Sequence, residues 1–302
     1  LFFENSTRTR ISFELAQKRL SADTVNFSAS SSSLKKGESF KDTAQNIEAM
    51  KIDAVVMRHP TPGAPKHLTE FIDSVVINAG DGTHEHPTQA ILDMMSLQEK
   101  FGKLKGLKIG ILGDIAHSRV ALSNIYGLLI MGAEVTLRGP PNLIPPFIKD
   151  LGVNVNTNVD EVIEWADALN VLRIQRERMG LGLIPSIREY RAMFGITQER
   201  LDHHKKEIVI MHPGPMNRGV EIDGTVADGD QAIILNQVLN GVASRMASHL
   251  YSSPSPRDST LFPMPSSARK NKNGTFKLIY VLSLRLTLVL RIFFFSHSLI
   301  LL

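Results

Sequence analysis

Leu1-Phe2-Phe3-Glu4-Asn5-Ser6-Thr7-Arg8-Thr9-Arg10 indicates a buried strand end that runs directly into a helix. The apolar start suits the strand, and the residues after it predict an amphipathic helix through their apolar pattern, Ile11, Phe13, Leu15, Ala16 and Leu20. Hydroxyl and guanidinium groups would then stand beside the backbone N–H groups that a helix leaves without internal partners at its N-terminus. Such a helix end favours negative charge, so the stretch predicts an anion site with phosphate as a natural ligand.

A simpler interpretation of the same residues stays open. Ser6 or Thr7 would serve only as a helix cap, and Arg8 and Arg10 would be solvated at the surface. The spacing alone does not choose between a cap and a phosphate site.

The composition suits a two-domain protein and excludes some chemistry. A length of 302 residues is enough for two domains with cores of their own. The absence of cysteine excludes disulfides and cysteine-ligated metals, and it suits a reducing compartment. Residues 251–302 carry seven Lys/Arg and one Asp, so residues 1–250 carry 27 Lys/Arg against 29 Asp/Glu. The net charge of +4 therefore gives no argument for nucleic-acid binding.

Strand-like apolar runs alternate with helical patterns, which predicts an α/β fold with parallel, doubly wound sheets. The expected strands are Val25–Phe27, Ala54–Met57, Val75–Asn78, Leu107–Leu112, Glu134–Leu137, Ala168–Leu172 and Ile208–Met211. The expected helices between them include Lys41–Met50, Thr88–Phe101, Arg119–Met131, Val159–Ala166 and Thr197–His204. The glycine-containing segment Lys100–Gly106 indicates a boundary between two halves.

The C-terminal residues 248–302 differ in kind from the rest. The helical pattern of Gln231–Ala247 stops, and two short peptides, Ser253–Asp258 and Met264–Ala268, resemble the translation of a sequencing-library adapter. The apolar run Leu278–Leu302 has the length of a membrane span, but each of its two arginines would cost about 2.5–3.5 kcal/mol near the bilayer centre. We therefore expect residues 248–302 to be a non-native tail, and no membrane partner.

Polar groups also stand after strands of the first half, where parallel sheets place ligands. Arg58 ends one such strand, although a single arginine there is more often part of a structural ion pair. His86-Pro87-Thr88-Gln89 follows a turn-rich loop. His84 and His86 suggest a metal only weakly, because a His-Glu-His triplet without further ligands rarely makes a site. The loop around Lys36 has the composition of a solvated basic segment.

The second half carries two arginines after strands. Arg119 follows Leu107–Leu112, and Arg173 follows Ala168–Leu172. Guanidinium groups bind carboxylates through two parallel hydrogen bonds, so a pair in one domain suits a dicarboxylate, although each arginine alone is more typical of a surface ion pair. His212-Pro213-Gly214-Pro215 predicts a rigid loop after the last expected strand.

These motifs, in this order, resemble the aspartate/ornithine carbamoyltransferase family. The resemblance covers Leu1 to about Ala247 and includes the family's Ser-Thr-Arg-Thr-Arg string at Ser6–Arg10. It implies two doubly wound parallel-sheet α/β domains with the active site in the cleft between them. The implied parts are a carbamoyl phosphate-binding domain at 1–101 with a bridging helix at 88–101, an aspartate-binding domain at 102–230, and a truncated return helix at 231–247 that packs on the first domain. It also implies that the family's first helix and most of its first strand are missing here.

The resemblance implies a set of residues that bind carbamoyl phosphate. The set consists of Ser6, Thr7, Arg8, Thr9, Arg58, His86, Gln89, Gly214 and Pro215. Catalytic roles would fall to Arg8, Thr9, Arg58 and His86. His86 would donate to the carbonyl oxygen while Gln89 holds the amide, and the loop at Gly214 and Pro215 would turn backbone carbonyls toward the same amide.

A second set would bind aspartate. The resemblance assigns the α-carboxylate to Arg119 and the side-chain carboxylate to Arg173 with Gln175, and it adds Lys36. Ser33 and Lys36 would reach the neighbouring subunit's site, which implies a homotrimer with shared active sites. The Arg-x-Gln-x-Glu-Arg string that begins at Arg173, and the lack of cysteine after His212, favour aspartate over ornithine.

The expected activity is transfer of the carbamoyl group of carbamoyl phosphate to L-aspartate, which gives N-carbamoyl-L-aspartate and phosphate in pyrimidine biosynthesis. Orientation and oxyanion stabilisation by Thr9, Arg58 and His86 would carry it, with the departing phosphate as proton acceptor. No metal and no other cofactor is expected.

Alternative functions remain. An ornithine carbamoyltransferase is one, and a non-catalytic homologue that scaffolds a partner enzyme is another, although such a protein should have lost pocket residues. A nicotinamide dehydrogenase is disfavoured because Gly110–Asp114 lacks the Gly-x-Gly-x-x-Gly turn. A regulatory chain or a dihydroorotase is a possible partner. We expect a cytoplasmic location, with an organelle address left open by the missing N-terminus.

Overall fold

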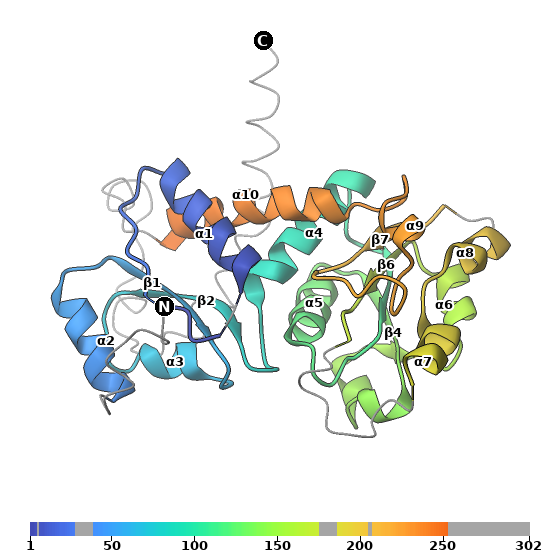
Figure 1. Cartoon of the computed structure of the whole chain (residues 1–302), viewed down its shortest axis with the longest axis horizontal. Helices are drawn as coiled ribbons and strands as arrows, with labels where there is room; N and C mark the ends of the chain where they lie inside the picture. Colours follow the sequence, from blue (N-terminus) through green and yellow to red (C-terminus); the bar gives the residue numbers. More distant parts are fainter. Residues whose placement is uncertain (5, 28–38, 175–185, 205–206, 253–302) are drawn as a thin grey trace, which may run out of the picture. The chain divides into compact units, whose positions relative to one another are not determined.

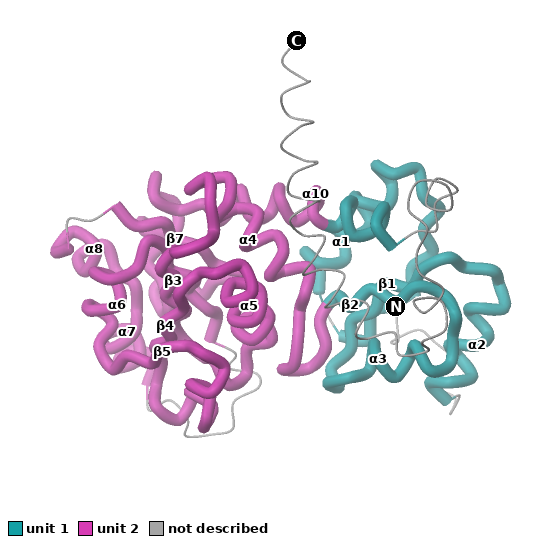
Figure 2. The backbone as a smooth tube through the Cα atoms, turned by 180° about the vertical axis from the view of Figure 1, so that it is seen from behind, with its two compact units in different colours: residues 1–79, 245–302 teal, residues 80–244 magenta. Residues whose placement is uncertain are grey.

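The computed structural model describes residues 1–4, 6–27, 39–174, 186–204 and 207–252. Contacts divide the described residues into two compact units (Figure 2): unit 1 holds those of 1–79 and 245–252, and unit 2 holds those of 80–244. The division falls before the predicted boundary at 101/102. The reason is that helix α4 (Pro87–Phe101) packs against helix α5 (Arg119–Ile130), so its contacts group it with unit 2.

Unit 1 is built on two neighbouring strands, β1 (Ala54–His59) and β2 (Val75–Asp81), with helices α1 (Thr7–Arg19), α2 (Phe40–Ala49) and α3 (Ala64–Leu68). Strand β1 is buried on both faces. Val55 and Met57 belong to one apolar cluster with residues of α2 and α3, whereas Val56 belongs to another with Phe13 of α1. This two-sided burial explains the continuous apolar run in the sequence.

The strand end predicted at the start of the chain is present. Phe2 forms a parallel bridge with Arg58, and the backbone N–H of Phe3 donates to the Arg58 carbonyl oxygen at 2.9 Å. Helix α1 begins at Thr7. The opening stretch therefore lies beside β1 before it enters the helix.

Unit 2 contains a five-stranded sheet in the order β5-β4-β3-β6-β7, and every strand pair in it is parallel. Its strands are β3 (Lys108–Leu112), β4 (Glu134–Arg138), β5 (Asn154–Val155), β6 (Ala168–Val171) and β7 (Val209–Met211). Helices α4 and α5 cover one face, and α6 (Val159–Trp165), α7 (Ile187–Phe194) and α8 (Gln198–His204) lie on the other (Figure 1). The predicted doubly wound α/β fold is confirmed.

Two glycines of unit 2 permit close approaches that a side chain would block. A Cβ atom on Gly110 of β3 would lie 2.8 Å from side-chain atoms of both Leu169 and Val162, so α6 packs directly on the strand. A Cβ atom on Gly139, just after β4, would overlap the backbone carbonyl of Gly113. The ends of β3 and β4 can therefore lie together only without a side chain at residue 139.

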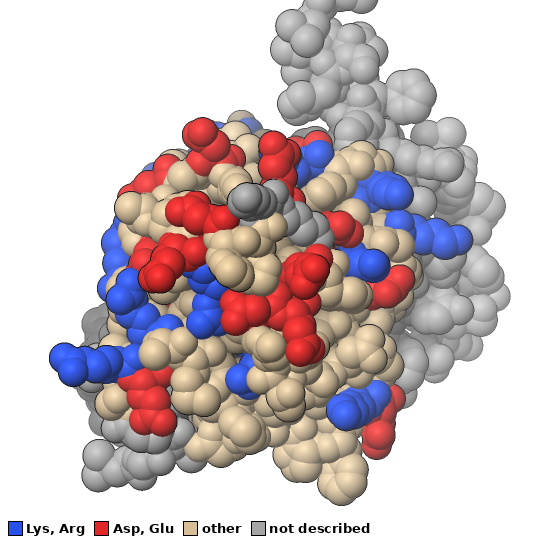
Figure 3. Space-filling model, turned by 90° about the vertical axis from the view of Figure 1, so that its right-hand side faces the viewer, with Lys and Arg blue, Asp and Glu red and all other residues tan. Residues whose placement is uncertain are grey.

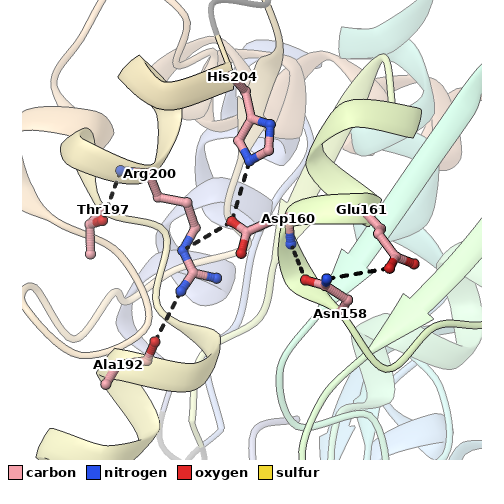
Figure 4. Close-up of polar contacts among 7 residues, drawn as sticks. All are labelled: Asn158, Asp160, Glu161, Ala192, Thr197, Arg200 and His204. Carbon is pink, nitrogen blue, oxygen red and sulfur yellow. Dashed lines mark hydrogen bonds and ion pairs between the residues drawn. The ribbon is translucent and has the colours of Figure 1, made fainter.

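Polar contacts join α6, α7 and α8, the helices on one face of the sheet (Figure 4). Asp160 Oδ1 of α6 lies 3.3 Å from His204 Nε2 and 3.5 Å from Arg200 Nε, both on α8. Arg200 Nη2 also donates to the Ala192 carbonyl of α7 at 2.9 Å. On the face shown in Figure 3, lysine and arginine side chains stand among aspartate and glutamate side chains.

Three local predictions differ from the structure. Residues Val25–Phe27 form no strand, and Val25 is 90% exposed. Strand β5 and helices α3, α7 and α9 (Gly224–Ala227) were not expected. Helix α10 (Ile234–Ser252) continues past the predicted end at Ala247.

The last turns of α10 are ordered by contacts within unit 1. Arg245 Nη1 donates to Ser12 Oγ of α1 at 2.7 Å, and the His249 ring packs edge-on against Phe13 with 5.8 Å between centroids. No helix among the described residues is both long and apolar enough to cross a membrane, and the run Leu278–Leu302 lies outside them.

Candidate active site

The serine that precedes α1 does not cap its helix, unlike the serines that precede α2, α5 and α7. Ser6 precedes α1 with extended backbone (φ −161°), yet its side chain makes no capping hydrogen bond. The serines before α2, α5 and α7 (Ser39, Ser118 and Ser186) each accept a backbone N–H of the first turn. No acidic residue stands in the first turn of α1. The interpretation of Ser6 as a simple cap is therefore wrong, and the helix end suits an anion.

Arg58 lies beside this helix end. Its Nη1 donates to Thr9 Oγ1 at 3.5 Å and to the Ala79 carbonyl at 3.3 Å, while its Nε lies 3.2 Å from Glu4 Oε2. The Arg58 side chain is only 13% exposed. Unit 1 thus brings Arg58 and Thr9 together, and the ion pair with Glu4 holds the cation in place.

A folded loop carries His86 to the start of α4 in unit 2. The buried Asp81 carboxylate accepts the Glu85 N–H at 3.1 Å and lies 3.0 Å from His84 Nδ1. His86 itself is buried, and its backbone N–H donates to Ser123 Oγ at 2.8 Å. In the described part of the chain no three His, Asp or Glu side chains group as metal ligands would.

Gln89, in the first turn of α4, is hydrogen-bonded to the buried carboxylate of Asp93, which the sequence pattern did not indicate as a site residue. Its Nε2 donates to Asp93 Oδ1 at 3.0 Å. Asp93 also accepts the side-chain amides of Asn124 at 2.8 Å, Gln237 at 2.7 Å and Asn170 at 3.5 Å. Burial raises the pKa of the Asp93 carboxyl to about 6, even though these hydrogen bonds favour its ionised form.

The two arginines expected for a dicarboxylate follow neighbouring strands. Strands β3 and β6 pair directly, with Leu112 opposite Val171 at their carboxyl ends. Arg119 is the first residue of α5, beyond β3, and it is 5% exposed. Arg173 follows β6 and is partly buried. Both therefore stand at the same edge of one parallel sheet, which is where α/β folds bind ligands.

The loop after β7 is held by another buried carboxylate. Gly214 N–H donates to His212 Nδ1 at 2.8 Å, and His212 Nε2 lies 3.3 Å from Glu221 Oε1. Glu221 also accepts the backbone and side-chain N–H groups of Asn217. Gly214 has φ +63°, a conformation that suits glycine, so the backbone turns sharply just before Pro215.

The predicted site residues thus fall into two sets. Ser6, Thr7, Arg8, Thr9 and Arg58 lie in unit 1, and His86, Gln89, Arg119, Arg173, Gly214 and Pro215 lie in unit 2. Ser33, Lys36 and Gln175 lie outside the described residues. Sequence reasoning missed Asp93, Glu221 and Gln237, and only Asp93 left a signal, as a charged residue four positions after Gln89 in an apolar helix.

Two family models match the chain. The model described as "Aspartate/ornithine carbamoyltransferase, carbamoyl-P binding domain" matches residues 1–99. The model described as "Aspartate/ornithine carbamoyltransferase, Asp/Orn binding domain" matches residues 105–251. Both domain models occur in the expected order.

Individual relatives agree with the family models. The aspartate carbamoyltransferase catalytic subunits of Gemmatimonas aurantiaca and Christiangramia forsetii are each 61% identical over 247 residues, which cover 82% of this chain. The matched part is 77% of the first protein and 80% of the second.

Solved structures also resemble the chain. Aspartate transcarbamoylase from Trypanosoma cruzi in complex with carbamoyl phosphate is 32% identical, with a TM-score of 0.76 over 84% of this chain and 82% of that one. The catalytic subunit of M. Jannaschii aspartate transcarbamoylase is 36% identical, with a TM-score of 0.71 over 82% of this chain and 81% of that one.

Proposed function

This chain belongs to the aspartate/ornithine carbamoyltransferase family, and from that membership we propose the reaction that its residues carry out. The chain transfers the carbamoyl group of carbamoyl phosphate to the amine of L-aspartate, giving N-carbamoyl-L-aspartate and phosphate. Relatives with 61% identity are named aspartate carbamoyltransferase catalytic subunits. Complexes of the Trypanosoma cruzi enzyme hold carbamoyl phosphate with aspartate, and carbamoyl aspartate with phosphate.

One structural observation supports the choice of aspartate as the acceptor. Arg119 and Arg173 stand at the carboxyl ends of two paired strands in unit 2. Two guanidinium groups at one sheet edge match the two carboxylates of aspartate, whereas the side chain of ornithine is a cation that they would repel. A non-catalytic scaffold would not need these arginines.

The residues act by orientation and charge stabilisation. The amine of aspartate attacks the carbonyl carbon, a C–N bond forms, and the carbonyl oxygen becomes an oxyanion. Donors from Thr9, Arg58 and His86 stabilise that oxyanion, while Ser6, Thr7 and Arg8 at the start of α1 hold the phosphate. The bond to the phosphate oxygen then breaks, and the departing phosphate takes the proton of the amine. No side chain needs to act as the base.

We also propose a homotrimer in which Ser33 and Lys36 of one chain complete the site of its neighbour. This rests on the family resemblance of the serine- and lysine-rich loop. We also propose a cytoplasmic location, which the absence of cysteine suits. A regulatory chain or a dihydroorotase is a partner of the right kind for such an enzyme.

Steady-state kinetics on single variants tests the two anion sites. Arg58→Ala should raise the KM for carbamoyl phosphate, and Arg173→Ala should mainly raise the KM for aspartate, each by about tenfold or more for a lost charge-assisted contact. Equal losses for both substrates in both variants would contradict the assignment. Failure of the unaltered chain to form N-carbamoyl-L-aspartate would contradict the function itself.

Mixing two inactive variants tests the shared site. Lys36→Ala and His86→Ala trimers, dissociated and reassembled together, should recover part of the activity because some interfaces then join two intact contributors. If mixtures never exceed the parent variants, Lys36 does not act across subunits.

A further inference from the structure

The amide group of carbamoyl phosphate needs hydrogen-bond acceptors, which the donors at Arg58 and the start of α1 do not provide. Its nitrogen carries two hydrogens and needs acceptors, whereas Arg58 and the start of α1 offer donors. The family resemblance supplies acceptors in unit 2, at Gln89 and on the loop after His212. A glutamine amide, however, presents either its oxygen or its NH₂ group, depending on what holds the other end.

Asp93 decides which end of Gln89 is available. An ionised carboxylate only accepts hydrogen bonds, so the Gln89 group that lies 3.0 Å from Asp93 Oδ1 must be Nε2. The Gln89 oxygen, on the other arm of the planar amide, is then directed away from Asp93. Because both residues lie one turn apart on α4, the backbone of the helix fixes their spacing.

The same carboxylate oxygen also holds the loop after β7, through Gln237. Gln237 Nε2 donates to Asp93 Oδ1 at 2.7 Å, which leaves Gln237 Oε1 to accept the backbone N–H of His212 at 3.0 Å. His212 in turn accepts the Gly214 N–H through Nδ1. A chain of hydrogen bonds therefore runs from Asp93 to the turn that precedes Pro215.

The other carboxylate oxygen anchors Asp93 to the body of unit 2. Oδ2 accepts Nδ2 of Asn124 on α5 and, at a longer distance, Nδ2 of Asn170 on β6. All four partners are neutral amides, and Asp93 is fully buried. With α4, α5, β6 and α10 tied to one carboxylate, its orientation is fixed by the fold and not by a ligand.

We propose that Asp93 is a positioning residue that turns two acceptors, the Gln89 side-chain oxygen and the backbone carbonyls of the His212–Pro215 loop, toward the amide of carbamoyl phosphate. Asp93 touches no substrate and acts through Gln89 and Gln237. The inference rests on the proposed function, and it makes Asp93 responsible for selecting a carbamoyl group over an acyl group that lacks the NH₂.

Two stable probes separate this role from a general structural one. Phosphonoacetamide keeps the amide of carbamoyl phosphate, and acetonylphosphonate replaces its NH₂ with a methyl group. By isothermal titration, the unaltered chain should bind phosphonoacetamide about tenfold or more tightly than acetonylphosphonate. Asp93→Ala should remove most of that preference by weakening phosphonoacetamide about tenfold, while acetonylphosphonate stays within about twofold. Asp160→Ala, which removes a surface aspartate on α6, is the matched control and should leave the ratio unchanged.

The outcomes divide clearly. Equal weakening of both probes in Asp93→Ala, or no weakening of either, would overturn the proposal. If Asp93→Ala does not fold, Gln237→Met decides by the same ratio, because it removes the link to the loop and keeps an apolar side chain of similar length. If the unaltered chain forms N-carbamoyl-L-aspartate but binds both probes with equal affinity, the positioning role alone is refuted. If it forms no product, the proposed function is refuted.

Discussion

Glu221 should be one of the most sensitive positions in unit 2, although it carries no predicted role at the site. Replacing Glu221 with alanine removes the acceptor for three donors, namely His212 Nε2, the Asn217 backbone N–H and Asn217 Nδ2. Each buried donor left without a partner costs about 1–3 kcal/mol, and because Asn217 is only partly buried the sum is about 3–5 kcal/mol. Glu221→Gln keeps the shape and one acceptor oxygen, so it should cost only about 1–2 kcal/mol.

Urea unfolding followed by tryptophan fluorescence measures this cost. Trp165 is the single tryptophan of the chain and packs against the core of unit 2, so its emission reports on the right unit. Glu221→Ala should also raise the KM for carbamoyl phosphate about tenfold, because the Gly214 turn loses its support. Asp228→Ala, which removes an exposed partner of Arg218, should change neither quantity. The reasoning would be refuted if the free energy of unfolding of Glu221→Ala lay within about 1 kcal/mol of that of the parent and its KM were unchanged.

Three further predictions concern stability. The pKa of the Asp93 carboxyl is about 6 in the folded protein and 3.8 as its ordinary value, so between these two pH values the native state binds more protons than the unfolded state. The free energy of unfolding should therefore fall by about 3 kcal/mol as the pH rises from about 4 to about 7, when it is measured by urea unfolding and compared with that of Asp93→Asn. Gly139→Ala should destabilise by about 3 kcal/mol or more because its Cβ would overlap the Gly113 carbonyl, whereas Gly224→Ala meets only the flexible end of an arginine and should be close to neutral in thermal melts. Asp160→Ala should cost less than about 1 kcal/mol by the same melts and leave both KM values unchanged, since this carboxylate is 48% exposed.

The sequence predicted the elements whose signal is local. The apolar runs of β1, β3 and β6 are buried from both sides, so their hydrophobicity alone marks them as strands. Val25–Phe27 has a similar composition but forms no strand: Val25 is exposed, although the Phe27 carbonyl accepts the backbone N–H of Phe2 at 3.4 Å. The two residues of β5 are too few to leave a pattern.

The placement of the candidate site residues was predictable to the extent that they follow strands or open helices. Arg58, Arg119 and Arg173 follow from that rule together with the family resemblance. The contact between Asp93 and Gln237 joins residues 144 positions apart, and such pairing leaves no periodic signal in a single sequence. The end of α10 was missed for the same reason: its last turn contains His249, whose ring packs against Phe13, a residue far away in the sequence.

The residues of unit 2 that bind the two substrates should differ in how readily they tolerate substitution. Arg119 and Arg173 project from the segments that follow β3 and β6, whereas Gln89 and the loop after His212 depend on one carboxylate shared by four secondary-structure elements. Substitutions in the segments after the strands would change which amine substrate the protein uses without disturbing the core. A change at Asp93 would have to be matched by several distant amides at once. Selection for a new acceptor should therefore draw on the strand-end segments, and directed-evolution libraries for this scaffold are best confined to them.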